Sequence, residues 1–160
     1  METQPVVHNT FTVERTYPVG AERVFAAFSD PQKKQRWFAE SGEHHTLEAY
    51  DLDFRDGGTE HYSSRFKDGL PVVGGLKLTN ESVFQNIVPN RRLVFTSTMW
   101  VGGRCISISV GTVELEAAQQ ETKLTLTFQS AFLENADGPA MREAGWKTLL
   151  ERLAKVLESE

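Results

Sequence analysis

Near the start of the chain, the spacing of the hydrophobic residues changes from a strand pattern to a helix pattern. In residues 11–17 (FTVERTY) apolar and polar side chains alternate, which is typical of a strand with one buried face. Pro18 ends this strand. In residues 21–28 (AERVFAAF) the apolar side chains instead fall on one face of a helix, so a first short helix is predicted there.

A second short helix is predicted to follow directly. Ser29 or Asp30 is a suitable N-cap, and Pro31 suits the first helical position. The helix carries a run of basic residues and glutamines (QKKQR) and ends on Trp37 and Phe38. We expect its charges to face water. We expect the two aromatic side chains to tie the helix over the open end of a sheet and to form one wall of its entrance.

From residue 44 the hydrophobic period becomes two, which predicts an antiparallel meander of six strands. The expected strands cover residues 44–54, 59–66, 81–88, 92–101, 104–117 and 121–132. Gly111 lies inside one of them, which indicates either a bulge or a close contact with another group. The long turn at residues 67–77 carries the apolar run LPVV, and we expect Val72 and Val73 to form a lid or a dimer contact.

A long helix is predicted at the end of the chain, over residues 138–160. Gly138 and Pro139 form a start signal, and a wide apolar stripe follows. The stripe comprises Met141, Gly145, Leu149, Leu153 and Val156, with Trp146, Leu150 and Leu157 beside it. Such a face must lie on apolar surface, and the concave side of the sheet is the candidate.

These elements predict an α+β fold in a single domain, residues 1–160. A strongly curved antiparallel sheet of about seven strands wraps around the long C-terminal helix, and two short helices follow the first strand. Space lined from both sides is expected between sheet and helix. A cavity of this kind suggests a ligand.

Composition and charge narrow the functional classes. The chain has 160 residues, 39% hydrophobic and 24% charged, with a net charge of -5. The acidic balance disfavours nucleic-acid binding in spite of the basic run. No apolar stretch is long enough to cross a membrane, and no secretory signal is visible. Cys105 is the single cysteine, which fits a reducing compartment, so we expect a cytoplasmic protein.

Five short motifs, in this order, resemble a known family. They are ERTYPVGAERVFAAFSDPQKKQRWF, FRDGGTEHYSSRFKDG, QNIVPNRRLVFT, GTVELEAAQQETKLTLTFQSAF and DGPAMREAGWKTLLERL. Together they extend over residues 11–157 and resemble the START-like superfamily, also called SRPBCC or Bet v 1-like. More narrowly, they resemble its branch named for the activator of Hsp90 ATPase homologue 1. The resemblance implies a helix-grip fold and places Trp146, in the GW motif, on the closing helix.

The resemblance implies several functions, because the superfamily includes lipid carriers, cyclases, receptors and co-chaperone domains. Our first hypothesis is a binding domain for an apolar or amphipathic small molecule, without chemistry of its own and without a cofactor. The second is an interaction module with a chaperone partner. The third is a cyclase- or hydrolase-like enzyme that uses His61 inside the cavity. A homodimer is also open.

Large aromatic and apolar side chains are the candidate ligand-binding residues, although packing in the core is the alternative for each of them. The candidates are Trp37, Phe38, His61, Tyr62, Arg65, Phe66, Phe84, Trp100, Met141, Trp146 and Leu149. On the strand 59–66, His61 and Arg65 share one face, and Tyr62, Ser64 and Phe66 share the other. Either face could be the concave one, and the aromatic side chains favour the second.

Other chemistry lacks a supporting pattern. His44 and His45 are adjacent in a strand and point in opposite directions, so a shared metal ion is not expected. Cys105 has the surroundings of an inert strand thiol. No GxSxG nucleophile motif and no glycine-rich phosphate loop are found.

Overall fold

The computed structural model describes residues 4–160. Residues 1–3 belong to the N-terminal segment in which no secretory signal is expected, and they lie outside the described range. The predicted order of one strand, two short helices, six strands and a long helix is confirmed. The strands are β1 (Val7–Tyr17), β2 (His45–Leu52), β3 (Thr59–Phe66), β4 (Lys77–Val88), β5 (Arg92–Val101), β6 (Arg104–Ala118) and β7 (Glu121–Phe132). The helices are α1 (Ala21–Ser29), α2 (Pro31–Lys34), the π-helical turn η1 (Gln35–Ala39) and α3 (Pro139–Glu158).

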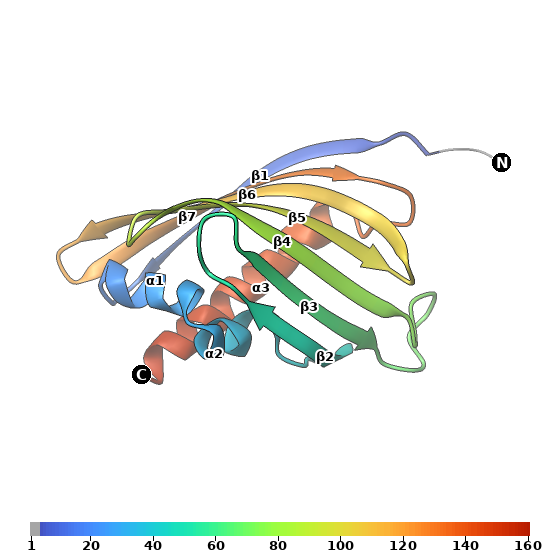
Figure 1. Ribbon diagram of the computed structural model, residues 1–160, viewed down its shortest axis with the longest axis horizontal. Coiled ribbons are helices and arrows are strands. Elements are labelled where there is room, and N and C mark those ends of the chain that lie inside the picture. Colours follow the sequence, from blue (N-terminus) through green and yellow to red (C-terminus); the bar gives the residue numbers. More distant parts are fainter. Residues whose placement is uncertain (1–3) are drawn as a thin grey trace.

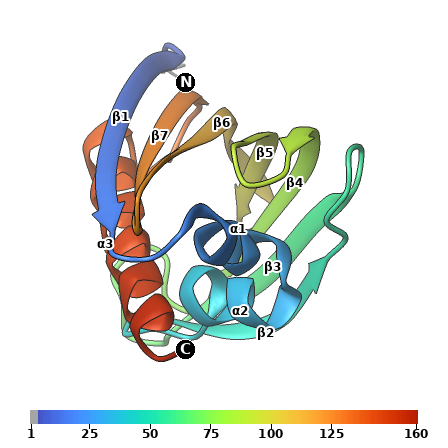
Figure 2. The same cartoon turned by 90° about the vertical axis from the view of Figure 1, so that its left-hand side faces the viewer.

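The strands form one seven-stranded antiparallel sheet with the order β1-β7-β6-β5-β4-β3-β2. Figures 1 and 2 show that the sheet curves strongly and that all helices lie on its concave side. Helix α3 runs along this concave side, while α1 and α2 lie beside its C-terminal part. In residues 4–160, the convex side carries no helix.

The core fills one end of the space between sheet and helices. Val24, Ala27 and Phe28 of α1 meet Leu153 and Val156 of α3 there, together with inward side chains of β1, β6 and β7. Full burial of each such side chain stabilises the fold by roughly 1.5–3 kcal/mol. This end of the molecule is therefore solid and anchors the last turns of α3.

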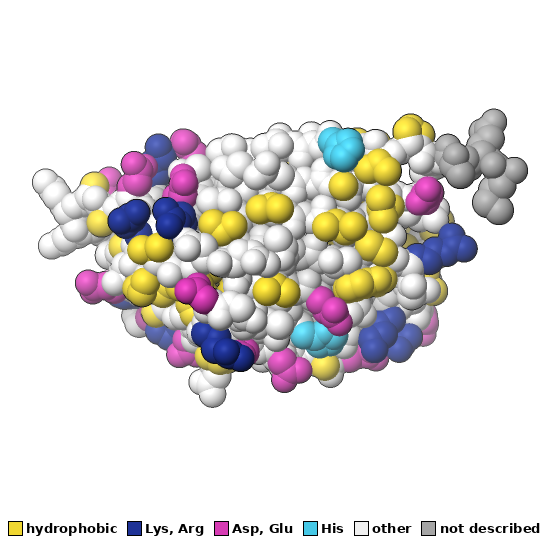
Figure 3. Space-filling model, turned by 45° about the horizontal axis from the view of Figure 1, so that its top comes forward, with side chains coloured by type: hydrophobic (Ala, Val, Ile, Leu, Met, Phe, Trp, Pro, Cys, Tyr) yellow, Lys and Arg dark blue, Asp and Glu magenta, His cyan; other side chains and the backbone are white. Residues whose placement is uncertain are grey.

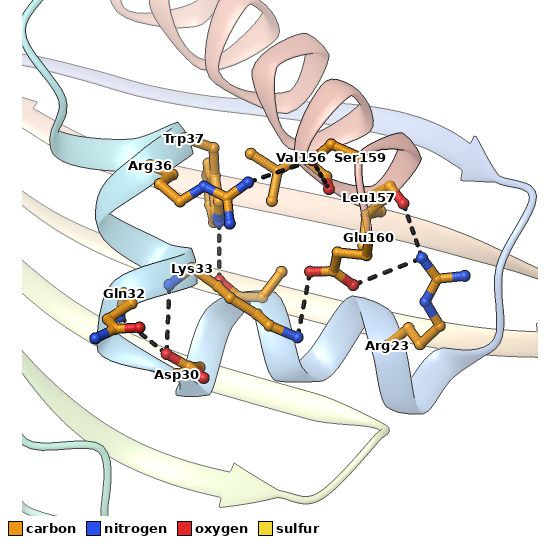
Figure 4. Close-up of polar contacts among 11 residues, drawn as sticks. Arg23, Asp30, Gln32, Lys33, Arg36, Trp37, Val156, Leu157, Ser159 and Glu160 are labelled. Carbon is orange, nitrogen blue, oxygen red and sulfur yellow. Dashed lines mark hydrogen bonds and ion pairs between the residues drawn. The ribbon is translucent and has the colours of Figure 1, made fainter.

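Polar contacts hold the C-terminal turn of α3 to α1 and α2 (Figure 4). Arg23 donates a hydrogen bond of 2.8 Å to the carbonyl oxygen of Leu157, one of the groups that a helix end leaves unpaired. Glu160 lies 3.2 Å from the ammonium group of Lys33 and 3.5 Å from the Arg23 guanidinium. These contacts fix the direction in which α3 leaves the core.

The expectation that the charges of the second helix face water is wrong for Lys34. Its side chain is buried, and Nζ lies 3.0 and 2.9 Å from the two carboxylate oxygens of Glu60 on β3. The hydroxyl of Tyr50 donates a third hydrogen bond, of 2.6 Å, to Glu60. The ammonium also lies 4.2 Å from the ring centre of Phe38. A buried charge is tolerated here because its partner is buried beside it.

Gly111 serves a close contact. A Cβ atom at this position would lie 2.3–2.8 Å from ring atoms of Phe95, the residue opposite it on β5. The register of β5, β6 and β7 is regular at this point, so no bulge is involved. Only glycine lets the Phe95 ring lie flat against the sheet, and this ring forms part of the site described next.

Candidate functional site

A cavity of about 560 Å³ lies between the concave face of the sheet and α3, at the end away from the solid core. Its size is within the range of ligand pockets, roughly 300–1,000 Å³. Side chains of β3, β4 and β5 form one wall, and residues 141–152 of α3 form the other. Most of the lining is apolar. Its aromatic members are Phe38, Tyr62, Phe66, Phe95, Phe128 and Trp146.

The aromatic rings meet around Trp146. Its ring centre lies 5.5 Å from that of Phe128, 5.9 Å from that of Phe38 and 6.4 Å from that of Phe95. Phe38 in turn meets Tyr62 edge to face at 5.6 Å. Pairs of this geometry stabilise one another. The rings therefore give this part of the cavity a rigid apolar wall.

Several of the predicted site residues line this cavity. They are Phe38, Tyr62, Phe66, Met141, Trp146 and Leu149. Tyr62 and Phe66 identify the concave face of β3, as the aromatic pattern favoured. Residues that lie opposite one another on neighbouring strands point to the same face of the sheet. Asn80 of β4 lies opposite Tyr62, Met99 of β5 lies opposite Asn80, and both line the cavity with it.

Two predicted residues are inside the protein but not at the cavity. Trp37 is fully buried in the core, where its indole N–H donates a 2.8 Å hydrogen bond to the carbonyl of Ala27. Phe84 faces the concave side of β4, but it lies farther along the strand, against Phe54, with a centre-to-centre distance of 5.0 Å. For both, the alternative of core packing is the correct one.

Three other predicted residues, His61, Arg65 and Trp100, lie on the outer face of the sheet, so the expectation that they line the cavity is wrong. His61 lies 3.5 Å from Glu81, and Arg65 lies 3.0 Å from Glu48. Trp100 follows the inward-facing Met99 on β5 and lies in a shallow depression beside Lys77 and Glu81. Alternation explains all three, since their neighbours along each strand face inward.

The polar lining of the cavity was not predicted from the sequence. Asn80 and Ser97 come from the strands, His45 begins β2, and Arg142 and Arg152 lie on α3. Strand alternation from Tyr62 would have indicated Asn80 and, through Met99, Ser97. No local signal marks His45, whose neighbour His44 is exposed.

Arg142 is a buried cation that is paired with a carboxylate. Its guanidinium donates to both carboxylate oxygens of Asp137, at 2.9 and 2.8 Å, and to the hydroxyl of Ser107 at 3.0 Å. It also lies over the ring of Phe132, at 5.2 Å from the ring centre. A bidentate pair of this geometry fixes both side chains. Arg142 therefore contributes a neutralised pair to the cavity wall.

Tyr62 presents a phenol that keeps its proton. Burial raises the pKa of Tyr62 to about 12; the nearby Arg142 charge lowers it, and the Glu60 and Asp137 carboxylates raise it further. The hydroxyl is therefore a neutral hydrogen-bond donor at neutral pH. It stands where the apolar wall meets the polar lining.

Some polar atoms at the cavity have no partner in the part of the chain that the structure describes. The side-chain oxygen of Asn80 is one, in a residue that is only 7% exposed, and Nδ1 of His45 is another. The great majority of buried polar atoms in proteins are hydrogen-bonded, and an orphaned one costs about 1–3 kcal/mol. Both atoms belong to residues that line the cavity.

The segment between β3 and β4 lies at the cavity mouth. Val73 lines the cavity, while Val72 is 95% exposed and has a φ of 66°, a strained value for a β-branched residue. Met141 lies on the opposite side of the mouth and is 68% exposed. The roles of lid and of dimer contact stay predictions.

Two features are absent from residues 4–160. No three histidine, cysteine, aspartate or glutamate side chains are grouped closely enough there to hold a metal ion. No helix in the same range has the length and apolar character needed to cross a membrane.

A curved sheet that grips a long helix over an internal cavity defines the helix-grip class of the START-like proteins. The family model of the activator of Hsp90 ATPase homolog 1-like proteins matches residues 18–158, so the chain belongs to this family. The family resemblance seen in the sequence is confirmed.

Solved structures agree. An uncharacterized protein from Rhizobium leguminosarum is 35% identical, with 98% of each chain covered and a TM-score of 0.86. A protein from Rhizobium loti is 40% identical, covering 96% of this chain and 99% of that one, with a TM-score of 0.82. A protein from Chromobacterium violaceum, 22% identical with a TM-score of 0.75 over 94% and 97% of the two chains, shares the fold. No curated protein matches the chain.

Proposed function

We propose that this protein binds an apolar or amphipathic small molecule in the cavity between the sheet and α3. The observation that carries the proposal is the cavity itself, with its rigid aromatic wall and with lining residues whose buried polar atoms lack partners in residues 4–160. Cavities that combine mostly apolar lining with a few placed polar groups are typical ligand sites.

Gly145 offers a way to test the proposal. It lines the cavity from α3, and a Cβ atom added there would meet no atom within 4 Å. A Cβ atom at this position therefore causes no clash, and a leucine side chain adds bulk to the lining of the cavity. Its matched control is Ala144→Leu, on the exposed face of the same helix turn.

The test ligand is decan-1-ol, followed by titration calorimetry. We expect the wild type and Ala144→Leu to bind it with the same affinity and Gly145→Leu to bind it at least about tenfold more weakly, a difference of about 1.4 kcal/mol. Failure of the wild type to bind decan-1-ol would contradict the proposal. If Gly145→Leu bound decan-1-ol as tightly as the wild type, the binding site would lie outside the cavity.

A chaperone-interaction module is the second candidate, and the description of the matching family names an activator of Hsp90 ATPase. The convex face of the sheet is free of helices, and apolar side chains are scattered over it among polar ones (Figure 3). Ile108 and Val83 are 50% and 37% exposed. The test is the ATPase rate of the Hsp90 from the same cell with added protein. No change in that rate, and no co-purified Hsp90, would remove this candidate.

The enzyme hypothesis loses its proposed acid or base. His61 lies on the outer face of β3, beside Glu81, and does not reach the cavity. We therefore propose binding without chemistry of the protein's own.

A further inference from the structure

One end of the cavity is basic. His45, the first residue of β2, and Arg152 of α3 both line it. Their side chains converge on Gly42, where a Cβ atom would lie 3.3 Å from a terminal nitrogen of Arg152 and 3.7 Å from Nε2 of His45. Two nitrogen-bearing side chains from distant parts of the chain thus come close together beside Gly42.

The two arginines of the cavity differ in their partners. Arg142 is neutralised by Asp137, with two hydrogen bonds to its carboxylate. Within residues 4–160, no carboxylate lies at ion-pair distance from Arg152. Nδ1 of His45, next to it, is buried and has no hydrogen-bond partner in the same range. No ion pair within the described residues therefore neutralises the positive charge of Arg152.

The groups that face His45 are all basic. Burial lowers the pKa of His45, and Arg152, His44 and Lys67 lower it further; no carboxylate acts in the opposite direction. His45 is consequently neutral at neutral pH, with a ring N–H to donate, and Arg152 supplies one positive charge. One net charge and a neutral donor match a singly charged anion better than a doubly charged phosphate.

We propose that the ligand is an amphipathic monocarboxylate, whose carboxylate lies between Arg152 and His45 and whose apolar part extends toward Trp146. This inference rests on the proposed function, because it assigns the ligand class of the same cavity. A fatty acid and an aromatic carboxylic acid share this chemistry. The apolar lining accepts the hydrocarbon or ring, and the basic end selects the charge.

The test compares decanoate with decan-1-ol, which differ in charge but share one chain length. We expect the wild type to bind decanoate more tightly than the alcohol. Arg152→Gln should weaken decanoate binding by about 10- to 100-fold, the loss expected for a charge-assisted hydrogen bond, and change alcohol binding by less than about threefold. Arg91→Gln, in the exposed turn between β4 and β5, removes the same charge away from the cavity and should change neither.

The outcomes separate the two claims. If neither compound binds, the proposed function fails. If both bind equally and Arg152→Gln changes neither, binding in the cavity stands and the carboxylate inference is overturned. Tighter binding of decyl phosphate than of decanoate would also overturn it, in favour of a phosphate ligand.

His45 gives an independent readout. A bound carboxylate favours the protonated imidazole, so decanoate affinity should rise between about pH 8 and about pH 6, where the carboxylate (pKa of about 4.3 in a model side chain) stays ionised. The rise should be absent in His45→Gln and absent for decan-1-ol. If the affinity for decanoate still rose at lower pH in His45→Gln, the protonation of His45 would not be its cause, and the placement of the carboxylate beside His45 would be overturned.

Discussion

The two parts of α3 lie over very different interiors. Residues 153–157 pack on α1 and the sheet, where Leu153 is fully buried and the nearby charges of Lys34 and Glu60 are paired. Residues 141–152 lie over the cavity, where Asn80 and His45 retain unpaired polar atoms and Arg152 has no acidic partner among the described residues. The first region is built for stability. The second carries features that are costly for stability and useful for a ligand.

The largest effect is expected from breaking the buried ion pair of the solid end. Lys34→Met leaves the Glu60 carboxylate buried and without its cation, and should lower the free energy of unfolding by about 3–5 kcal/mol. Chemical denaturation measures this. The double variant Lys34→Met, Glu60→Leu removes both charges and should recover much of the loss. A cost below about 1 kcal/mol for the single variant would show that the pair is effectively solvated.

Two leucines one turn apart compare the regions directly. Leu153→Ala creates a void in close-packed surroundings and should cost about 2–5 kcal/mol. Leu149→Ala only enlarges a space that exists already, and should cost less than about half as much. Denaturation midpoints of the two variants check this difference. Equal costs would mean that the cavity end is packed as tightly as the core.

Asn80→Leu should have a small effect of the opposite sign. It replaces a buried amide, whose oxygen has no partner in residues 4–160, by an apolar side chain of similar size, so the protein should gain about 1 kcal/mol of stability. Ligand affinity should fall at the same time, as expected where a functional site is retained at a cost in stability. A loss of stability in this variant would show that the Asn80 side chain is satisfied within the fold.

The smallest predicted effect is a loss of folding stability at acidic pH. Because burial and basic neighbours lower the pKa of His45, the unfolded chain binds a proton there more readily than the folded protein. Stability should therefore decline as the pH falls through the unfolded value of about 6.5, and the decline should be weaker in His45→Gln. Unfolding curves at several pH values measure it. Identical declines in both proteins would contradict the assignment.

The sequence predicted the fold well because hydrophobic period is a local property. Each strand and helix was predicted from its own residues, although β4 begins at Lys77 and not at residue 81 as expected. The stripe Met141, Gly145, Leu149 correctly marked the face of α3 that meets the cavity. The site was only partly predictable. Whether a residue points to the concave or the convex side of the sheet depends on the neighbouring strands. For this reason His61, Arg65 and Trp100, which were expected at the cavity, lie on the outer face.

Long-range partners explain the remaining differences. Lys34 looked like a surface lysine because its partner Glu60 lies 26 residues farther along the chain. Arg152 and His45 come together only through the docking of α3 on the sheet, and neither belongs to a motif. Such pairs become visible when the elements are placed in space.

Ligand binding in the cavity can be tested by mass spectrometry of the purified protein, first native and then denatured. We expect the wild type to carry a small molecule that leaves on unfolding. We expect this molecule to be an acid with an apolar part, and Gly145→Leu to carry much less of it. A wild type that carries nothing and takes up neither decanoate nor decan-1-ol would show that the cavity is not a ligand site.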